Sequence, residues 1–323
     1  MEPGPGEGGP PPLRVLTVGA GAVGGFYSAK LAQGGARVST VHRSDFQEVV
    51  RAGIRVESIH GDFHFTPYRV WEQVADATER ADYILVATKV LPLIDTAAVI
   101  APAVGPGTVI VMLQNGIEIE GPVARAFPDN EIVSGLAFVC LSRLAPGRIA
   151  HLCHGRVVLG RYPSGLSPAA ERLAACFRKA GIPCVVTDDI ALERWRKLVW
   201  NAAFNPISVL SGGMTTTAIM ADREIRQLVE AVMAEVVDVA ASAGHRLPEG
   251  VIAKNLEDTM RMQPYRTSML LDWENGRSLE VEAILGNLVS AARRLGVATP
   301  RCETLYALLT SLTTARPDAA RGV

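Results

Sequence analysis

Residues 15–24 read VLTVGAGAVG, a short β-branched run that leads into the pattern GxGxxG, with Gly19, Gly21 and Gly24 at its fixed positions. The segment that follows, 22–33, has helical composition. Between a strand and a helix, the first glycine permits a tight turn, the second lets the backbone approach a pyrophosphate, and the third allows the helix to pack closely on the strand. The stretch therefore predicts a dinucleotide-binding turn at the head of an α/β domain, with a purely structural glycine turn as the alternative.

The first half of the chain alternates strand and helix signals outward from this turn. Strand-like runs cover 14–18, which leads into the turn, and 37–41, 83–87 and 108–112. A small hairpin is predicted over 54–57 and 63–66, and a helix over 92–101. Continuous apolar strands joined by helices indicate a parallel sheet covered on both faces. Beyond Phe127 the pattern indicates an antiparallel extension, then a helix and a last strand, over 131–140, 147–153, 156–160, 168–180 and 183–187.

Strand signals nearly vanish after residue 187, and helical segments take their place. These cover 189–199, 221–243, 248–262, 279–295 and 301–312. We therefore predict an α/β protein, with an N-terminal Rossmann-type parallel-sheet domain that has an antiparallel extension, plus an all-helical C-terminal domain. The expected units are a disordered tail over 1–12, a nucleotide-binding domain over 13–187, and a helical domain over 188–323 that carries the substrate and catalytic groups.

The composition excludes several classes of protein. Of the 323 residues, 48% are hydrophobic and the mean hydropathy is +0.20, so the chain has the apolar surface that disordered chains lack. A formal net charge of −1 lacks the excess of positive charge that is typical of nucleic-acid-binding proteins. The apolar runs fall far below the ~20 residues that span a bilayer, and the Gly/Pro-rich start lacks the regions of a signal peptide. We expect a cytoplasmic protein that binds neither nucleic acid nor membranes.

The cysteines give no sign of a disulfide framework or a metal site. None of the five forms a CxxC pair: Cys140, Cys153, Cys176, Cys184 and Cys302. An odd number in a chain of this length is typical of reduced thiols. His151, Cys153 and His154 have no second cluster at zinc spacing, so we expect no metal.

The end of the second predicted strand bears on the choice of cofactor. An NAD site usually places a carboxylate about twenty residues after the glycine turn, whereas residues 40–44 read TVHRS. Arg43 can pair with a 2′-phosphate through two N–H donors, and a carboxylate would repel that group. We predict NADP(H), with Arg43 bound to the phosphate and His42 or Ser44 as helpers. A solvent-facing arginine is the alternative.

Two later strand ends point to the same crevice, because ligands of open α/β sheets lie outside the carboxyl ends of the strands. Lys89 follows the strand at 83–87, and Asn115 follows the strand at 108–112. A surface lysine and an ordinary Asn-Gly turn are the alternatives.

Residues 193–206 read ERWRKLVWNAAFNP and hold Lys197, Asn201 and Asn205 four residues apart. That spacing stacks the three side chains along one face of an otherwise apolar helix, where they need partners if buried. Pro206 removes a helical hydrogen bond and disfavours the helical conformation before it, so a kink is expected. The alternative is a polar stripe that touches solvent.

A second polar set spans Ser268 to Glu280. Glu280 lies at the start of a predicted helix whose apolar residues recur at helical spacing. The alternative to a site residue is a structural one, in which this acid in the first turn is stabilised by the helix dipole.

Together these motifs resemble the ketopantoate reductase (2-dehydropantoate 2-reductase) family over about residues 13–312. The resemblance rests on the glycine turn, VATK at 86–89, LQNG at 113–116, Lys197 through Asn201 to Asn205-Pro206, and Ser268-Met269 to Glu280. It implies NADPH as hydride donor and a 2-oxo acid bound between two domains. It further implies that Lys197 is catalytic, that Lys89 and Asn115 lie near nicotinamide and substrate, that Asn201 and Asn205 bind substrate, that Ser268 holds its carboxylate, and that Glu280 contacts the reacting end.

The expected reaction is the NADPH-dependent reduction of a 2-oxo acid, with 2-dehydropantoate as the first candidate, for pantothenate and coenzyme A biosynthesis. A protonated lysine at the ketone oxygen would stabilise the alkoxide and donate the proton. Tyr265 and Thr215 stand where the family often has asparagine, so a different 2-oxo acid or ketone is an alternative.

Two other classes stay open: a non-catalytic NADPH-binding regulator and an opine- or amino-acid-type dehydrogenase. The apolar helix around 229–239 packs either within its domain or across the twofold interface of a homodimer, because periodicity does not distinguish the two.

Overall fold

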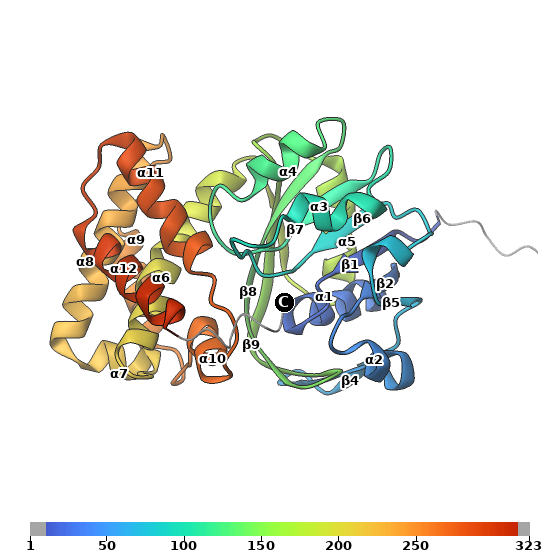
Figure 1. The fold of residues 1–323 in the computed structure, drawn as a ribbon, viewed down its shortest axis with the longest axis horizontal. Helices are drawn as coiled ribbons and strands as arrows, with labels where there is room; N and C mark the ends of the chain where they lie inside the picture. The colour runs from blue at the N-terminus through green and yellow to red at the C-terminus, as the bar shows by residue number, and fades with distance from the viewer. Residues whose placement is uncertain (1–10, 316–323) are drawn as a thin grey trace, which may run out of the picture.

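A single ten-stranded sheet organises the N-terminal half of the protein (Figure 1). The computed structural model describes residues 11–315, so nearly all of the expected tail over 1–12 lies outside the described residues. Six strands run parallel in the order β8-β7-β6-β1-β2-β5. They are β1 Arg14–Val18, β2 Arg37–Val41, β5 Val70–Trp71, β6 Tyr83–Val86, β7 Val109–Met112 and β8 Ile132–Ala145. The strand order reverses beside β1, which is where such sheets bind ligands.

The predicted antiparallel extension is one long hairpin rather than three short strands. β8 pairs antiparallel with β9 (Arg148–Arg161), and both strands have 14 residues. Their register shifts at three places, between Phe138 and Val139, between Cys140 and Leu141, and between Arg143 and Ala145. Such bulges break the regular alternation of side chains, which is why the strands look interrupted in the sequence. β9 also pairs with β3 (Ile54–Ser58) and β10 (Cys184–Thr187), and β3 pairs with β4 (Phe63–Phe65).

Helices cover both faces of the sheet, as continuous apolar strands require. The helices of this half are α1 Ala22–Gln33, α2 Phe46–Ala52, α3 Thr96–Ile100, α4 Glu120–Ala126 and α5 Pro168–Lys179, with short 3-10 turns at Val74–Asp76 and Ala101–Ala103. One apolar core contains Phe26 of α1 and Phe177 of α5, and a second contains Ile100 and Val123. The helix predicted over 92–101 starts later, because Asp95 caps it by accepting from the amides of Ala97 and Ala98.

After β10 the described chain is helical, so the predicted fold class is confirmed. The helices are α6 Ile190–Leu210, α7 Thr216–Ala221, α8 Arg223–Ser242, α9 Val251–Met260, α10 Ser268–Glu274, the π-helix η3 Glu282–Gly286, α11 Asn287–Leu295 and α12 Pro300–Thr314. α6 continues through Pro206, beyond the helical segment predicted over 189–199, and it holds Lys197, Asn201 and Asn205 on one helix, as their spacing indicates. The apolar face of α8 is buried within this chain. Within residues 11–315, no helix is long and apolar enough to cross a membrane.

The expectation that all cysteines are reduced thiols is wrong for one pair. Cys140 of β8 and Cys153 of β9 form a disulfide, with their Cα atoms 5.0 Å apart. The two residues face each other in the hairpin register, at a spacing that a disulfide can bridge. A count of cysteines contains no information about strand register, so the sequence could not reveal the pair. The other three cysteines are free and buried.

A buried ion pair joins α6 to the carboxyl edge of the sheet. Arg194 of α6 pairs with Glu120 at the start of α4, and both side chains are almost fully buried. Arg194 also donates to Ser134 Oγ at 2.8 Å, and Ser134 donates to Glu120 at 2.6 Å. The remaining guanidinium N–H groups donate to backbone carbonyls at the end of β7 and in the loop after it, those of Met112, Gln114 and Gly116. This network fixes α6 against that loop.

Replacing Arg194 with methionine leaves a carboxylate and three carbonyls buried without their donor. We expect the free energy of unfolding to fall by roughly 3–5 kcal/mol, measured by urea denaturation. The matched control is Arg196→Met on the same helix, since Arg196 is exposed and pairs only with Glu193; it should cost less than about 1 kcal/mol. Equal stability of the two variants would contradict the role given to Arg194.

Candidate functional site

The glycine turn between β1 and α1 is built for close contact on one side and open space on the other. Gly19 has a φ of +86°, and a Cβ there would lie 2.6 Å from the Thr88 amide nitrogen. A Cβ on Gly24 would lie 2.4 Å from the Gly19 carbonyl oxygen. A Cβ on Gly21 would meet nothing within 4 Å, and no side chain caps α1. The first amides of α1 are therefore available to an anion such as a phosphate.

The end of β2 offers one free cation beside this turn. Arg43 is exposed, and its guanidinium makes no hydrogen bond or ion pair with the described residues. His42 is buried, and burial lowers its pKa to about 4, so the imidazole is neutral at pH 7. Ser44 donates to Asp45 at 2.9 Å. Of the three residues singled out at this strand end, Arg43 alone is exposed without a partner.

Arg143 of β8 also reaches the end of β2, a contact that no local sequence pattern indicates. It pairs with Asp45 and donates to Ser44 at 3.3 Å. A small cavity lies between this pair and the glycine turn, and Gly21, His42, Asp45 and Arg143 are among the residues that line it. The long hairpin therefore contributes a second guanidinium to this corner of the sheet.

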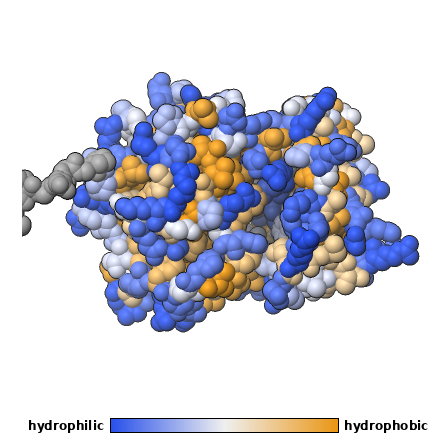
Figure 2. Space-filling model, turned by 180° about the vertical axis from the view of Figure 1, so that it is seen from behind, coloured by the Kyte–Doolittle hydropathy of each residue, from blue (hydrophilic) through white to orange (hydrophobic). Residues whose placement is uncertain are grey.

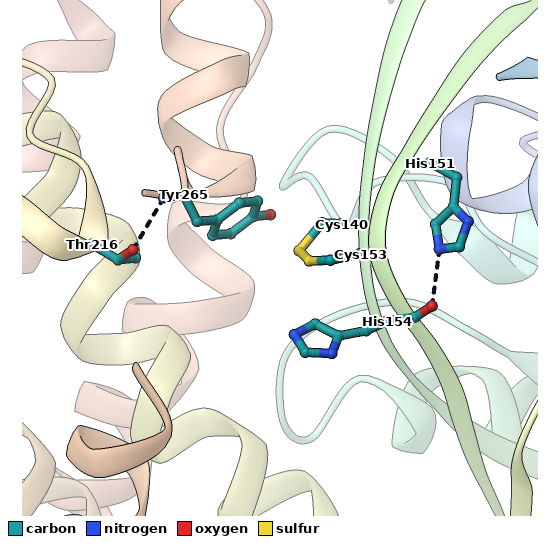
Figure 3. Close-up of a disulfide and its surroundings, with 6 residues drawn as sticks. All are labelled: Cys140, His151, Cys153, His154, Thr216 and Tyr265. Carbon is teal, nitrogen blue, oxygen red and sulfur yellow. Dashed lines mark hydrogen bonds between the residues drawn. A yellow bond between two sulfur atoms is a disulfide. The ribbon is translucent and has the colours of Figure 1, made fainter. Parts of the chain in front are cut away.

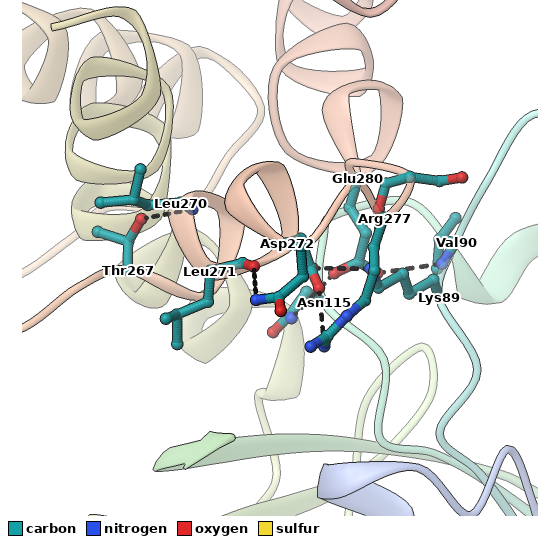
Figure 4. Close-up of polar contacts among 11 residues, drawn as sticks. Lys89, Val90, Asn115, Thr267, Leu270, Leu271, Asp272, Arg277 and Glu280 are labelled. Carbon is teal, nitrogen blue, oxygen red and sulfur yellow. Dashed lines mark hydrogen bonds and ion pairs between the residues drawn. The ribbon is translucent and has the colours of Figure 1, made fainter. Parts of the chain in front are cut away.

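A chain of hydrogen bonds brings together three of the predicted site residues. Lys197 Nζ donates to Asn115 Oδ1 at 2.9 Å and to the Ala137 carbonyl at 2.8 Å. Asn115 Nδ2 donates to Glu280 Oε2 at 3.3 Å, and the Val90 amide donates to Glu280 Oε1 at 3.0 Å (Figure 4). Lys197 on α6, Asn115 after β7 and Glu280 just before η3 thus form one connected group at the carboxyl edge of the sheet.

Lys89 lies nearby but is engaged in a different contact. Its ammonium pairs with Asp272 of α10 at 2.7 Å and donates to the Ser278 carbonyl at 2.8 Å (Figure 4). Asp272 also pairs with Arg277 at 3.4 Å. Lys89 therefore ties the end of β6 to α10.

The electrostatic setting of Lys197 and Glu280 favours proton exchange near neutral pH. Burial and the nearby Arg194 guanidinium lower the pKa of Lys197 to about 7, against the opposing effect of Glu280. Burial raises the pKa of Glu280, and the hydrogen bonds from Val90 and Asn115 partly oppose that rise. An amine with a pKa close to the working pH can both hold and release a proton, as general acid catalysis requires.

The remaining predicted residues offer polar groups that the protein leaves unused. Asn201 is partly buried one turn after Lys197, and its side chain has no hydrogen bond within the described chain. Asn205 is buried, and its Oδ1 has no donor. Ser268 is exposed as the first residue of α10. These groups could bind a ligand that approaches α6 and α10.

The two positions that depart from the family pattern have different local roles. Thr215 caps α7, since its hydroxyl accepts from the Ala218 amide at 3.3 Å. Tyr265 is held through its backbone, which donates to the Thr216 hydroxyl at 3.2 Å and accepts from the Thr216 amide. The Tyr265 ring points toward the sheet (Figure 3). Seen from behind, the surface is mostly polar with apolar patches, and it is hollowed where the two halves of the molecule meet (Figure 2).

Comparison with known proteins identifies relatives over nearly the whole chain. Residues 15–164 match the family model described as ketopantoate reductase PanE/ApbA, and residues 189–313 match the model of its C-terminal part. A 2-dehydropantoate 2-reductase from Nostoc sp. is 37% identical over 91% of this chain and 93% of its own length.

Solved structures give the same picture. The crystal structure of 2-dehydropantoate 2-reductase from Methylococcus capsulatus has 47% identity and a TM-score of 0.88, and the match covers 94% of this chain and 98% of that one. A D-mandelate dehydrogenase solved with NADH and anilino(oxo)acetate has 23% identity and a TM-score of 0.84 over 94% of this chain and 99% of that one, which shows a shared fold.

The glycine turn makes a prediction about stability alone. Gly24→Ala would place a methyl group 2.4 Å from the Gly19 carbonyl oxygen. We therefore expect the free energy of unfolding to fall by about 1–3 kcal/mol relative to the wild type. Gly21→Ala, whose methyl group meets no atom, is the control and should stay within about 0.5 kcal/mol of the wild type. Calorimetric unfolding of both variants decides this, and a Gly24→Ala protein as stable as the control would refute the close packing.

Proposed function

We propose that this chain, which belongs to the ketopantoate reductase family, catalyses the NADPH-dependent reduction of a 2-oxo acid to a 2-hydroxy acid, with 2-dehydropantoate as the first candidate. As a member of that family the chain is an oxidoreductase that acts on CH–OH groups. Residues 13–187 would bind the nucleotide, and residues 188–323 would supply the lysine and most substrate contacts. The pantoate formed would serve the synthesis of pantothenate and coenzyme A.

The observation that carries the proposal is the group Lys197–Asn115–Glu280. It combines an ammonium whose pKa is about 7 with an amide that orients it, beyond the end of a central strand. A non-catalytic nucleotide-binding protein has no need for such a group, so the geometry favours the enzyme over the regulator.

The residues present fit a nicotinamide dinucleotide. Gly21 leaves open space before the free amides of α1, which suits a pyrophosphate, and the buried Gln114 Oε1 has no donor of its own. Arg43 would bind a 2′-phosphate, and that contact favours NADPH, although the D-mandelate dehydrogenase neighbour was solved with NADH. When bound, the cofactor would supply the hydride for the carbonyl carbon of the substrate.

In this mechanism Lys197 is the general acid. Two of its three N–H bonds point at Asn115 and Ala137, which leaves one for the oxygen of a bound ketone. The ammonium would stabilise the negative charge that develops on that oxygen and then transfer a proton from Nζ. Asn115 orients Lys197, and Glu280 in turn orients Asn115 through the amide nitrogen. Lys197 would regain its proton from water after product release.

The substrate would lie against α6 and α10. Asn201 and the unpaired Oδ1 of Asn205 would bind polar groups of the acid, and Ser268 would hold its carboxylate. The Tyr265 ring points from the helical side toward the β8–β9 hairpin (Figure 3). A ring that faces the substrate would stack on another aromatic ring, so an aromatic 2-oxo acid is the second candidate. A panel of 2-dehydropantoate and aromatic 2-oxo acids with NADPH separates these candidates. Turnover only in the presence of an amine would instead support an amino-acid-type dehydrogenase.

The role of Lys197 predicts a specific loss of turnover. Lys197→Met should lower kcat by roughly 10²–10⁴-fold while the affinity for NADPH changes little, because only the proton donor is lost. The readout is the loss of NADPH absorbance with the best 2-oxo acid of the panel. Lys254→Met is the control, since Lys254 is exposed and pairs with Asp258. A Lys197→Met enzyme with normal turnover would remove Lys197 from this role.

The lowered pKa of Lys197 also predicts the direction of the pH dependence. Reduction needs the protonated ammonium, which is present below the pKa and lost as pH rises through about 7. We therefore expect kcat/KM for reduction to fall on the alkaline side of neutrality in a steady-state pH series. A rate that rises through this range would contradict the assignment of Lys197 as the acid.

The role of Arg43 predicts a change in cofactor preference. Arg43→Ala should weaken NADPH binding by roughly tenfold to hundredfold, since one charge-assisted contact is worth about 1.5–3 kcal/mol. NADH binding should stay the same, because NADH has no 2′-phosphate. Arg37→Ala, at the opposite end of β2, is the control. Titration calorimetry with both nucleotides gives the ratio of affinities, and an unchanged ratio would reject Arg43 as the specificity residue.

A further inference from the structure

A second cluster of reactive side chains lies on the β8–β9 hairpin, outside the group around Lys197. Cys140 and Cys153 are paired across the two strands, and His154 follows at once in β9. The sulfur atoms and one imidazole nitrogen of the three residues all lie within 4.8 Å of one another. The role proposed for the protein as a reductase makes no use of this cluster.

A bulge in β9 creates the cluster. Phe138 pairs with Arg156 and Val139 pairs with His154, so Gly155 is an extra residue. In a regular strand the side chains of residues 153 and 154 would point to opposite faces. His154 instead has a φ of +61° and Gly155 a φ of +138°, and the imidazole lies on the same side as the disulfide (Figure 3). A left-handed histidine is uncommon, and here it brings a base next to two sulfur atoms.

The cluster is placed to influence the reaction site. Ala137, three residues before Cys140 on the same strand, accepts the hydrogen bond from Lys197 Nζ at 2.8 Å. Phe138 lies between them, with the Lys197 ammonium 5.4 Å from its ring centre. From the helical side, the Tyr265 ring points toward the disulfide (Figure 3). A covalent bond between residues 140 and 153 therefore constrains the segment that supports Lys197 and faces Tyr265.

The cluster also differs from the other cysteines in its access to small reagents. Cys153 is half-buried and His154 is exposed, although Cys140 itself is buried. Cys176, Cys184 and Cys302 are all buried, and burial raises the pKa of each thiol, that of Cys184 to about 12. Buried thiols of raised pKa are unreactive, so thiol exchange would be confined to the pair on the hairpin.

We propose that Cys140 and Cys153 form a reversible dithiol–disulfide site that reacts with low-molecular-weight disulfides such as glutathione disulfide, and that its redox state sets the affinity of the enzyme for its 2-oxo acid. The second part rests on the proposed reductase function, and the first part does not. His154 acts on the thiols as a base, since one nitrogen of its imidazole lies within 4.8 Å of both sulfur atoms.

The exchange balances in two steps. The Cys153 thiol gives its proton to His154, and the thiolate attacks one sulfur of the small disulfide, whose S–S bond breaks to release one thiolate. Cys140, deprotonated in turn, attacks Cys153 in the mixed disulfide and releases the second small thiolate. The two released thiolates take up the two protons, so the protein pair loses two electrons and two protons while one small disulfide becomes two thiols. Excess small thiol reverses both steps.

The test of the site itself uses the full-length protein in mixtures of reduced and oxidised glutathione. A chelator is present, because two thiolates and an imidazole also form a donor set for soft metal ions. After an acid quench, free thiols are alkylated and located by mass spectrometry. We expect residues 140 and 153 to change together from alkylated to disulfide-linked as the oxidised fraction rises, with the other three cysteines unchanged. A pair that stays reduced in oxidised glutathione, or stays oxidised in excess dithiothreitol, overturns the proposal.

The role of His154 is tested by the rate of this exchange. Asparagine also tolerates the left-handed conformation, so His154→Asn keeps the bulge and removes the base. We expect oxidation of the pair to slow several-fold while the final ratio of oxidised to reduced protein stays the same. An unchanged rate would remove His154 from the exchange.

The effect on the enzyme is tested by kinetics in the two redox states. We expect KM for the 2-oxo acid to differ by about threefold to tenfold between them, while the Kd for NADPH stays constant. Cys140→Ser and Cys153→Ser should abolish this response. Cys176→Ser is the control, because a serine can keep the hydrogen bond that Cys176 donates to the Leu31 carbonyl. Identical KM values in both states would overturn the proposed effect of the redox state on substrate affinity. If the protein turns over no 2-oxo acid, the proposed function fails, but the thiol measurement still tests the dithiol–disulfide site by itself.

Discussion

The buried guanidinium of Arg194 is the contact on which the rest of the site depends. It neutralises Glu120 and satisfies the carbonyls on both sides of Asn115, those of Gln114 and Gly116. Lys197 lies three residues further along α6, and its Nζ donates to Asn115 Oδ1 at 2.9 Å. The helix and the loop are therefore aligned by the same charge. Replacing such a pair with apolar residues often costs little stability, whereas breaking it is expensive, so its value here lies in positioning.

The same charge also contributes to the chemistry. Burial does most to lower the pKa of Lys197, Arg194 lowers it further through repulsion, and Glu280 opposes both through attraction. The result is an amine whose pKa is about 7. A lysine placed in the same position without this surrounding would hold its proton too tightly for rapid transfer. Position and acidity are thus set together by one arginine, one carboxylate and the exclusion of water.

The sequence was most informative where the signal is local. The glycine turn, the parallel strands and the spacing of Lys197, Asn201 and Asn205 all depend on neighbouring residues, and the family match confirms the resemblance that these motifs suggested. The contacts that were missed join distant parts of the chain. Arg194 meets Glu120, Lys89 meets Asp272, and Cys140 meets Cys153 only after strands and helices have packed. The last of these also depends on bulges that the pattern of residues does not reveal.

The β8–β9 hairpin touches both ends of the proposed site. Arg143 on β8 contacts Ser44 and Asp45 at the end of β2, and Ala137 on the same strand contacts Lys197. Six residues of extended chain span about 20 Å. One strand therefore sets the separation between the end of β2, where we propose that the adenosine binds, and Lys197, the proposed general acid. A single-residue insertion between these two positions would move one anchor relative to the other, so the length of this strand matters to the proposed site as much as its side chains do.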